Sequence, residues 1–428
     1  MRRPWSFNIA LLAVAITAGC SRPAESTSSA PQPPAASEAQ AASKPVSGGA
    51  DWPQFLGPNA TGMSSEKGIN KAWASRPPKA LWRAPMGDDG YAGPAVAGGL
   101  VFILDVQNGQ SCVKALSLAT GKQKWATPVP DSGGSNYGFG KSTPAVSGGK
   151  VYAITRNALV VCLDAAAGSL VWSKDLVAEA GARKPTWEFA TSPVIDGDRV
   201  LAAVGAAGAC LVALDKKSGE ILWRGGNDDG PGYSTPTVAT LNGQKQIIVF
   251  SAKQVMGIAP DTGRAIWSHP WQTSYDVHAA TPRVLDNTVI VTSGYGTGGA
   301  RLDVSGGSAS VRWQNKDLQS RFTTPILAGG FLYCTGERGE LACIDSANGR
   351  VAWSRSGFEW GGLVGVDGTL IVMNGSNGDV VQVAMSPAGY KELGRIAPLG
   401  GQAWTAPIVA QGRLLVRNKK ELVCLDLK

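Results

Sequence analysis

The sequence predicts an all-β fold: an eight-bladed β-propeller of four-stranded antiparallel blades, with the ring closed by the N-terminal strand. Two repeated features predict it. A tryptophan recurs at intervals of 40 to 51 residues, and a small residue followed by proline stands between most successive tryptophans. A period of this length with four short strands per repeat is typical of propeller blades. The recurring tryptophans are Trp82, Trp125, Trp172, Trp223, Trp267, Trp313 and Trp353.

The repeat that ends at Trp172 illustrates the four strands. Thr143-Pro144 begins the first strand, where a proline is tolerated because the ladder does not need its missing N–H. Apolar runs at 151–154 and 160–163 predict the second and third strands. Residues 164–168 form a turn in which the aspartate caps its own backbone and the glycine supplies a positive φ. The fourth strand carries the tryptophan.

Counting these units gives eight blades. Seven first strands carry the proline, and an eighth blade without it is predicted at residues 362–393, where Leu393 or a neighbour replaces the tryptophan. The chain ends in a third strand at 421–426, whereas the strand around Trp82 is a fourth strand with no first three before it. The N-terminal strand is therefore predicted to complete the last blade, which removes the exposed edges of an open ring.

The residues before the propeller are predicted to be an export signal and a tether. Residues 1–20 have a basic start, a short apolar run and a sequence ending at Cys20 that resembles a bacterial lipobox, in which the cysteine is lipidated. Residues 21–50 are rich in Ala, Ser and Pro and predict a disordered tether. A lead-in segment, 51–78, precedes the propeller at 79–428. We expect a lipid-anchored protein on the periplasmic side of the outer membrane or on the cell surface.

Charge and cysteine content limit the partners further. The formal net charge is +8, with no cluster of Lys and Arg, so an exported protein of this kind is not expected to bind nucleic acid. Contact with the membrane is expected through the lipid anchor. Cys334 and Cys343 flank a tight turn and are predicted to stand directly opposite each other, which would allow a disulfide in an oxidising compartment.

One pattern stands apart from the repeat itself. An aromatic residue precedes almost every first strand, in the connections that emerge on one face around the central channel. Aromatic residues with arginine are typical of binding hot spots, so a binding ring is predicted there; the alternative is that each aromatic packs under its own loop. The predicted ring consists of Tyr91, Phe139, Phe189, Tyr233, Tyr275, Phe322, Trp360 and Trp404, with Lys141, Arg283, Arg301 and Arg321 nearby.

No catalytic residue or metal ligand is predicted. His269 and His278 are the only histidines, too few for a histidine-based metal site. The repeated aspartates belong to the turns. They are Asp164, Asp215, Asp345 and Asp426.

The repeated phrase carries a family resemblance. Ala115–Trp125 and Ala213–Trp223 resemble the tryptophan-docking motif of pyrroloquinoline quinone (PQQ) propeller repeats, Ala-x-Asp-x-x-Thr-Gly-x-x-x-Trp, with Ser117 for Asp and Ser218 for Thr. In that family the tryptophan packs on the neighbouring blade and locks the ring. The order of leader, lipobox, tether and propeller resembles the BamB-type outer-membrane assembly lipoproteins.

The resemblance implies a non-enzymatic scaffold that binds envelope proteins, with the β-barrel assembly machinery as partner. The alternatives are a PQQ-dependent quinoprotein oxidoreductase and a sensor propeller that binds a carbohydrate or another small ligand. PQQ dehydrogenases place two adjacent cysteines against the quinone and bind calcium. This chain has no adjacent cysteines and no acidic cluster with calcium-ligand spacing, so no cofactor is expected.

Overall fold

The computed structural model describes residues 49–87, 89–131, 137–227 and 230–428. The predicted signal peptide, Cys20 and all of the tether except its last two residues lie outside these ranges. Within them, no helix has the length and apolar character needed to cross a membrane.

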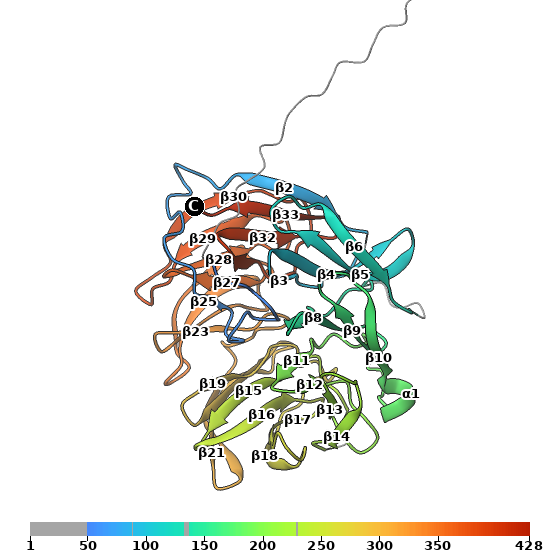
Figure 1. Cartoon of the computed structure of the whole chain (residues 1–428). Coiled ribbons are helices and arrows are strands. Elements are labelled where there is room, and N and C mark those ends of the chain that lie inside the picture. The colour runs from blue at the N-terminus through green and yellow to red at the C-terminus, as the bar shows by residue number, and fades with distance from the viewer. Residues whose placement is uncertain (1–48, 88, 132–136, 228–229) are drawn as a thin grey trace, which may run out of the picture. The chain divides into compact units, whose positions relative to one another are not determined.

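The predicted eight-bladed propeller is confirmed (Figure 1). Each blade is an antiparallel sheet whose first strand is innermost. Blade 1 consists of β3 (Ala95–Ala97), β4 (Leu100–Gln107), β5 (Gln110–Ser117) and β6 (Gln123–Pro128). Blade 2 consists of β7 (Ala145–Ser147), β8 (Lys150–Ile154), β9 (Leu159–Asp164) and β10 (Leu170–Asp175), and the short helix α1 (Leu176–Ala180) follows it. Blade 3 consists of β11 (Val194–Asp196), β12 (Arg199–Ala202), β13 (Leu211–Asp215) and β14 (Ile221–Gly225), and blade 4 of β15 (Thr237–Leu241), β16 (Gln244–Phe250), β17 (Gln254–Ile258) and β18 (Ala265–Pro270).

The remaining blades repeat this plan. Blade 5 consists of β19 (Arg283–Leu285), β20 (Thr288–Ser293), β21 (Gly298–Ser305) and β22 (Ser308–Asn315), and blade 6 of β23 (Ile326–Ala328), β24 (Phe331–Thr335), β25 (Glu340–Asp345) and β26 (Val351–Ser356). Blade 7 consists of β27 (Leu363–Val366), β28 (Thr369–Met373), β29 (Val380–Ala384) and β30 (Glu392–Ile396), with β1 (Met63–Ser64) added beside β27. Blade 8 consists of β31 (Ile408–Ala410), β32 (Arg413–Arg417), β33 (Glu421–Asp426) and β2 (Ala80–Pro85).

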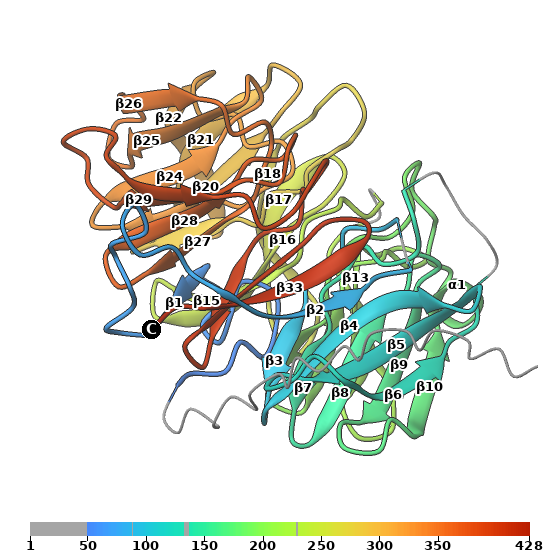
Figure 2. The same cartoon turned by 90° about the horizontal axis from the view of Figure 1, so that it is seen from above.

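The ring closes as predicted. Strand β2 pairs antiparallel with β33, with Trp82 opposite Cys424. Figure 2 shows β2, in blue, lying beside the red β33, so the first strand of the predicted propeller and the last strand of the chain lie in one blade. The last blade therefore has its fourth strand, and no blade is left open.

The tryptophans and glycines of the repeat meet across neighbouring blades. A Cβ atom at Gly121 would lie 2.6 Å from the ring of Trp82, and one at Gly168 would lie 2.5 Å from that of Trp125. Each glycine also has a positive φ, so no other residue would suit the turn and the contact equally well. The indole N–H groups of Trp82 and Trp125 donate to the carbonyls of Leu118 (2.8 Å) and Ala165 (3.1 Å) in the next blade.

The small residue of the proline phrase also joins neighbouring blades. The backbone N–H of Thr143 donates to Ser192 Oγ (2.9 Å), and that of Ser192 donates to Thr235 Oγ1 (3.0 Å). A buried hydrogen bond of this kind satisfies a donor that water cannot reach. The phrase therefore links first strands around the channel.

Blade 7 lacks the tryptophan, and the lead-in segment covers its place. The residue at the tryptophan position, opposite Gln382, is Gly394, not Leu393. A Cβ atom there would lie 2.5 Å from the Cβ of Trp73, whose side chain is only 1% exposed. The Gln382 amide also donates to the Asn70 carbonyl (2.9 Å). A tryptophan from another part of the chain thus packs where blade 7 has a glycine in place of the tryptophan of the repeat.

Residues 49–64 run along the inner strands of the ring. Trp52 forms a β-bridge with Val96 of blade 1, and β1 pairs in parallel with β27 of blade 7. The Pro53 carbonyl accepts from Val146 N in blade 2 (2.7 Å). A cavity of about 200 Å³ lies between residues 54–60 and the first strands of blades 3 and 4. This part of the lead-in segment therefore occupies the central channel.

The predicted pairing of Cys334 with Cys343 is wrong. In the register of β24 and β25, Cys343 lies opposite Tyr333 and Cys334 lies opposite Ala342. An offset of one residue directs the two side chains to opposite faces of the sheet. Both thiols are free and buried, and burial raises the pKa of Cys343 to about 11.

Candidate functional site

The connections from the outer strand of one blade to the inner strand of the next lie on one face of the ring, which we call the loop face. Of the eight predicted aromatics, Tyr275 is 58% and Phe322 39% exposed. Four others are half-buried: Tyr91, Tyr233, Trp360 and Trp404. Phe139 and Phe189 are each 2% exposed and belong to the core, so the alternative of packing under their own loops holds for these two.

Several exposed and half-buried aromatics of the loop face form one connected set. We call Tyr91, Tyr275, Tyr295, Phe322, Trp360 and Trp404 the aromatic arc. Tyr91 stacks on Trp404 with ring centroids 5.0 Å apart, and Trp404 stacks on Phe322 at 5.8 Å. Trp360 meets Trp404 edge-on at 5.8 Å. The loops between blades 5 and 6, 6 and 7, 7 and 8, and 8 and 1 therefore share one aromatic surface.

Arg321 lies within the aromatic arc. Its guanidinium carbon is 4.3 Å from the ring centre of Tyr295, 4.9 Å from that of Phe322 and 5.3 Å from that of Trp360. One of its NH2 groups donates to the Tyr295 hydroxyl at 3.1 Å. Cation–π contacts of this kind hold the guanidinium in place. The predicted binding ring did not include Tyr295, because this residue lies between the second and third strands of blade 5 and not before a first strand.

The backbone of the arc is strained at two of its aromatics. Tyr295 and Trp360 have φ angles of 60° and 61°, in the left-handed region that bulky residues rarely adopt. Such a backbone conformation costs about 1–3 kcal/mol of folding free energy per residue, and it persists where the surrounding structure holds it in place. The Trp360 indole donates to the Glu337 carbonyl (2.9 Å), which helps fix this conformation.

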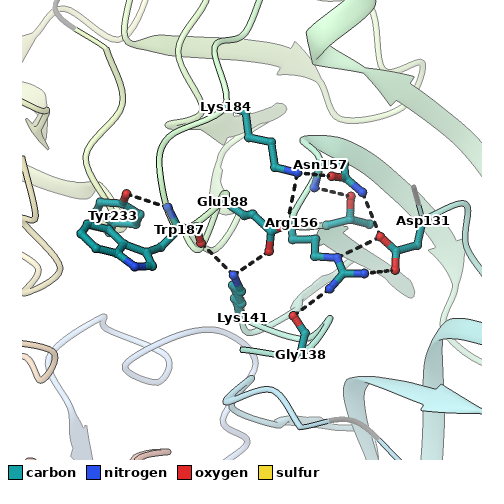
Figure 3. A network of polar contacts seen from close by, with 10 residues as sticks. Asp131, Gly138, Lys141, Arg156, Asn157, Lys184, Trp187, Glu188 and Tyr233 are labelled. Atoms are coloured by element: carbon teal, nitrogen blue, oxygen red, sulfur yellow. Dashed lines mark hydrogen bonds and ion pairs between the residues drawn. The ribbon is translucent and has the colours of Figure 1, made fainter. Parts of the chain in front are cut away.

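A different arrangement fills the loop face near blades 1 to 3. Figure 3 shows what we call the polar arc: Asp131, Lys141, Arg156, Asn157, Lys184 and Glu188. Arg156 donates from Nε to Asp131 (2.9 Å) and from NH1 to the Gly138 carbonyl (3.1 Å). Lys141 donates to Glu188 at 2.7 Å, and Lys184 pairs with the same carboxylate at 3.2 Å. These charges satisfy one another within the protein.

The two arcs meet at Trp187. Its carbonyl accepts from Lys141 (2.7 Å), its N–H donates to the Tyr233 hydroxyl (3.2 Å), and its ring meets Tyr275 edge-on at 6.0 Å. Burial lowers the pKa of Lys141, although Glu188 opposes this, and burial raises the pKa of Tyr233. Trp187 precedes Phe189 by two residues, and the sequence prediction selected the wrong member of the pair as the surface aromatic.

Two of the predicted cations do not belong to this face. Arg283 is 6% exposed and donates to the Ala60 carbonyl (2.8 Å) in the channel. Arg301 is 5% exposed and donates to the Ser346 carbonyl of blade 6 (3.1 Å). Both lie on strands, so their side chains point between or inside the blades and not toward the loops. Lys141 and Arg321 are on the loop face as predicted.

The contacts of His278 are those of a residue that stabilises the fold. Its ring is fully buried, stacks on Phe250 with centroids 4.4 Å apart and contacts Ser293 Oγ at 3.0 Å. Its other ring nitrogen contacts the Ala252 carbonyl at 2.9 Å. Burial lowers the pKa of His278 to about 4, so the ring is neutral at neutral pH.

The channel is a poor fit for the quinone that the resemblance suggests. A quinone bound there would have to share the channel with residues 49–64, which pair with the first strands of blades 7 and 1. Across the described part of the chain, no three His, Cys, Asp or Glu side chains are grouped to hold a metal ion.

Eight four-stranded blades with interlocking Trp and Gly contacts define a PQQ-like β-propeller. The family described as outer membrane protein assembly factor BamB matches residues 109–355, and the chain belongs to this family. The chain is 27% identical over 250 residues to outer membrane protein assembly factor BamB of Shewanella oneidensis, covering 54% of this chain and 60% of that relative. It is 24% identical over 351 residues to the Yersinia pestis protein of the same name, covering 79% and 76%.

Solved structures show the same fold. BamB from Moraxella catarrhalis matches with a TM-score of 0.60 at 15% identity, over 82% of this chain and 98% of that one. Quinohemoprotein alcohol dehydrogenase from Comamonas testosteroni matches with a TM-score of 0.66 at 15% identity, over 88% and 80%. Because the fold is shared by proteins with such different names, it does not by itself define the activity.

Proposed function

We propose that this protein is a non-enzymatic, lipid-anchored scaffold that binds other envelope proteins during outer-membrane protein assembly, with the β-barrel assembly machinery as its partner. The observation that carries the proposal is the aromatic arc, in which Tyr275 and Phe322 are exposed, on a member of the BamB family. Aromatic residues with an arginine supply most of the binding energy in many protein interfaces. We assign partner binding to this part of the loop face.

The ring suits a scaffold because its loops rest on a rigid support. Buried tryptophans and hydrogen bonds join consecutive blades, so the loops keep fixed relative positions. Binding sites on such a support lose little conformational entropy when a partner binds. The segment at 49–64 in the channel favours this proposal over a quinoprotein oxidoreductase.

The membrane anchor is proposed at Cys20. A Cys20→Ala variant should no longer incorporate labelled palmitate and should leave the membrane fraction. Unchanged membrane association of this variant would contradict the lipid anchor.

The partner surface is tested by purification of the full chain from detergent-solubilised membranes. A Tyr275→Ala/Phe322→Ala variant removes the two most exposed rings of the aromatic arc. A Leu170→Ala/Val171→Ala variant is the matched control, because these side chains are also exposed, at 57% and 45%, but lie on the outer strand β10. We expect the first variant to lose co-purifying assembly components and the control to keep them. Equal recovery of these components with both variants would contradict the proposal.

A further inference from the structure

We propose that the aromatic arc binds an extended polypeptide segment in which apolar or aromatic residues alternate with acidic ones, and that Arg321 recognises a carboxylate of that segment. This inference rests on the proposed function and specifies the chemistry of the partner. It follows from the unused hydrogen-bond donors of Arg321, from the exposed rings beside it and from the hydrogen bonds and charges of the surrounding polar groups.

Arg321 has unused capacity to donate hydrogen bonds. A guanidinium has five N–H donors, and among the described residues Arg321 donates one hydrogen bond, to the Tyr295 hydroxyl. Glu337 lies 3.8 Å away, too far for a hydrogen bond, and its carboxylate accepts from Gly296 N at 3.1 Å instead. The Arg321 Nε atom is buried without an acceptor. A planar guanidinium held between aromatic rings is well suited to bind a carboxylate.

The surroundings of Arg321 favour apolar side chains. Phe322 and Tyr275 expose 39% and 58% of their surface, and Phe322 also contacts the guanidinium. In many protein interfaces, the residues that contribute most binding energy are arginines and aromatics whose surroundings exclude water. An arginine beside exposed apolar surface fits that description. A segment with aromatic and acidic residues would satisfy both requirements at once.

The polar groups of the arc argue against a sugar as the ligand. Tyr91 donates its hydroxyl to Gln402 (3.0 Å), and the Trp360 indole donates to the Glu337 carbonyl. Tyr91, Trp404 and Phe322 stack on one another at interplanar angles of 23° and 24°, so part of their ring faces is already covered. Sugars need open ring faces with free hydrogen-bonding groups beside them.

The other charges near the arc are compatible with an acidic segment. Lys419 lies 5.5 Å from the ring centre of Tyr91 and extends the positive charge along the arc. Glu359 accepts a hydrogen bond from Ser376 (3.2 Å). Asp276, beside Tyr275, and Asp89, two residues before Tyr91, are exposed acids that an acidic segment would have to avoid.

The test is fluorescence anisotropy of the full-length protein with a labelled peptide in which Phe, Asp and Ser alternate. The reference peptide has Lys in place of Asp. We expect the acidic peptide to bind at least about tenfold more tightly, and Arg321→Gln to remove most of this difference. Arg355→Gln is the matched control, because Arg355 also lies over an aromatic ring, that of Tyr390 at 5.4 Å, but on the outer strand β26. Glu337→Gln should keep or increase the affinity for the acidic peptide.

Equal affinity for both peptides, no binding of either, or an unchanged preference in Arg321→Gln would overturn the inference. Tighter binding of an oligosaccharide such as maltoheptaose would also overturn it. Thermal melts of each variant show whether it is folded, and Glu337→Gln tests the same site without removing Arg321. The peptide experiment does not depend on co-purification, so a peptide that fails to bind while assembly components still co-purify would reject this inference alone.

Discussion

The aromatic arc and the polar arc are built from equivalent loops of one repeat, yet their side chains are used in opposite ways. In the polar arc Phe139 is buried, and Arg156 forms its ion pair with Asp131 inside the protein. In the aromatic arc Phe322 is exposed, and Arg321 is stacked on rings with its nearest carboxylate 3.8 Å away. A loop that satisfies its own groups supports the fold, and a loop that leaves them available can bind a partner.

The largest difference is expected between the two phenylalanines. Phe139→Ala should destabilise the protein by about 3–5 kcal/mol, because it empties a buried site. Phe322→Ala should change the free energy of unfolding by less than about 1 kcal/mol, since its ring is partly in solvent. Urea unfolding of both variants measures this, and equal losses of stability would remove the distinction between the arcs.

A smaller difference is expected between the two arginines. Arg156→Ala leaves the carboxylate of Asp131 largely buried without its guanidinium partner, which should cost about 3 kcal/mol. Arg321→Ala breaks only a loose, partly exposed ion pair and several ring contacts, so we expect a loss of about 1 kcal/mol. Chemical denaturation near neutral pH provides the comparison. A greater loss for Arg321→Ala would mean that this arginine mainly stabilises the fold.

The buried His278 gives a pH-dependent test of stability. Burial lowers its pKa from 6.5 to about 4, so the unfolded chain takes up the proton at a higher pH than the folded protein. Stability should therefore fall as the pH drops from 6.5 toward 4, by up to about 3 kcal/mol from this group. His278→Gln removes this contribution, and its stability should depend less on pH over that range. The same pH dependence in both proteins would show that the ring is not held neutral.

The repeat explains which features the sequence could predict. Trp82 and the other docking tryptophans recur with their turns, so blade number and ring closure followed from the period. Trp73 and Tyr295 occur once, outside the repeated positions, and only the folded chain shows what they contact. Arg283 and Arg301 were misplaced because nearness in sequence to a loop does not determine the direction of a side chain on a strand.

The aromatic arc is the surface at which we expect partner proteins to bind. The most direct measurement is photo-crosslinking in living cells, with p-benzoylphenylalanine in place of Phe322 or, as a control, of Val311. Val311 is 44% exposed but lies on the outer strand β22. We expect a crosslink from position 322 to a component of the outer-membrane assembly machinery and none from position 311. Crosslinks to that machinery from position 311 and not from position 322 would contradict it.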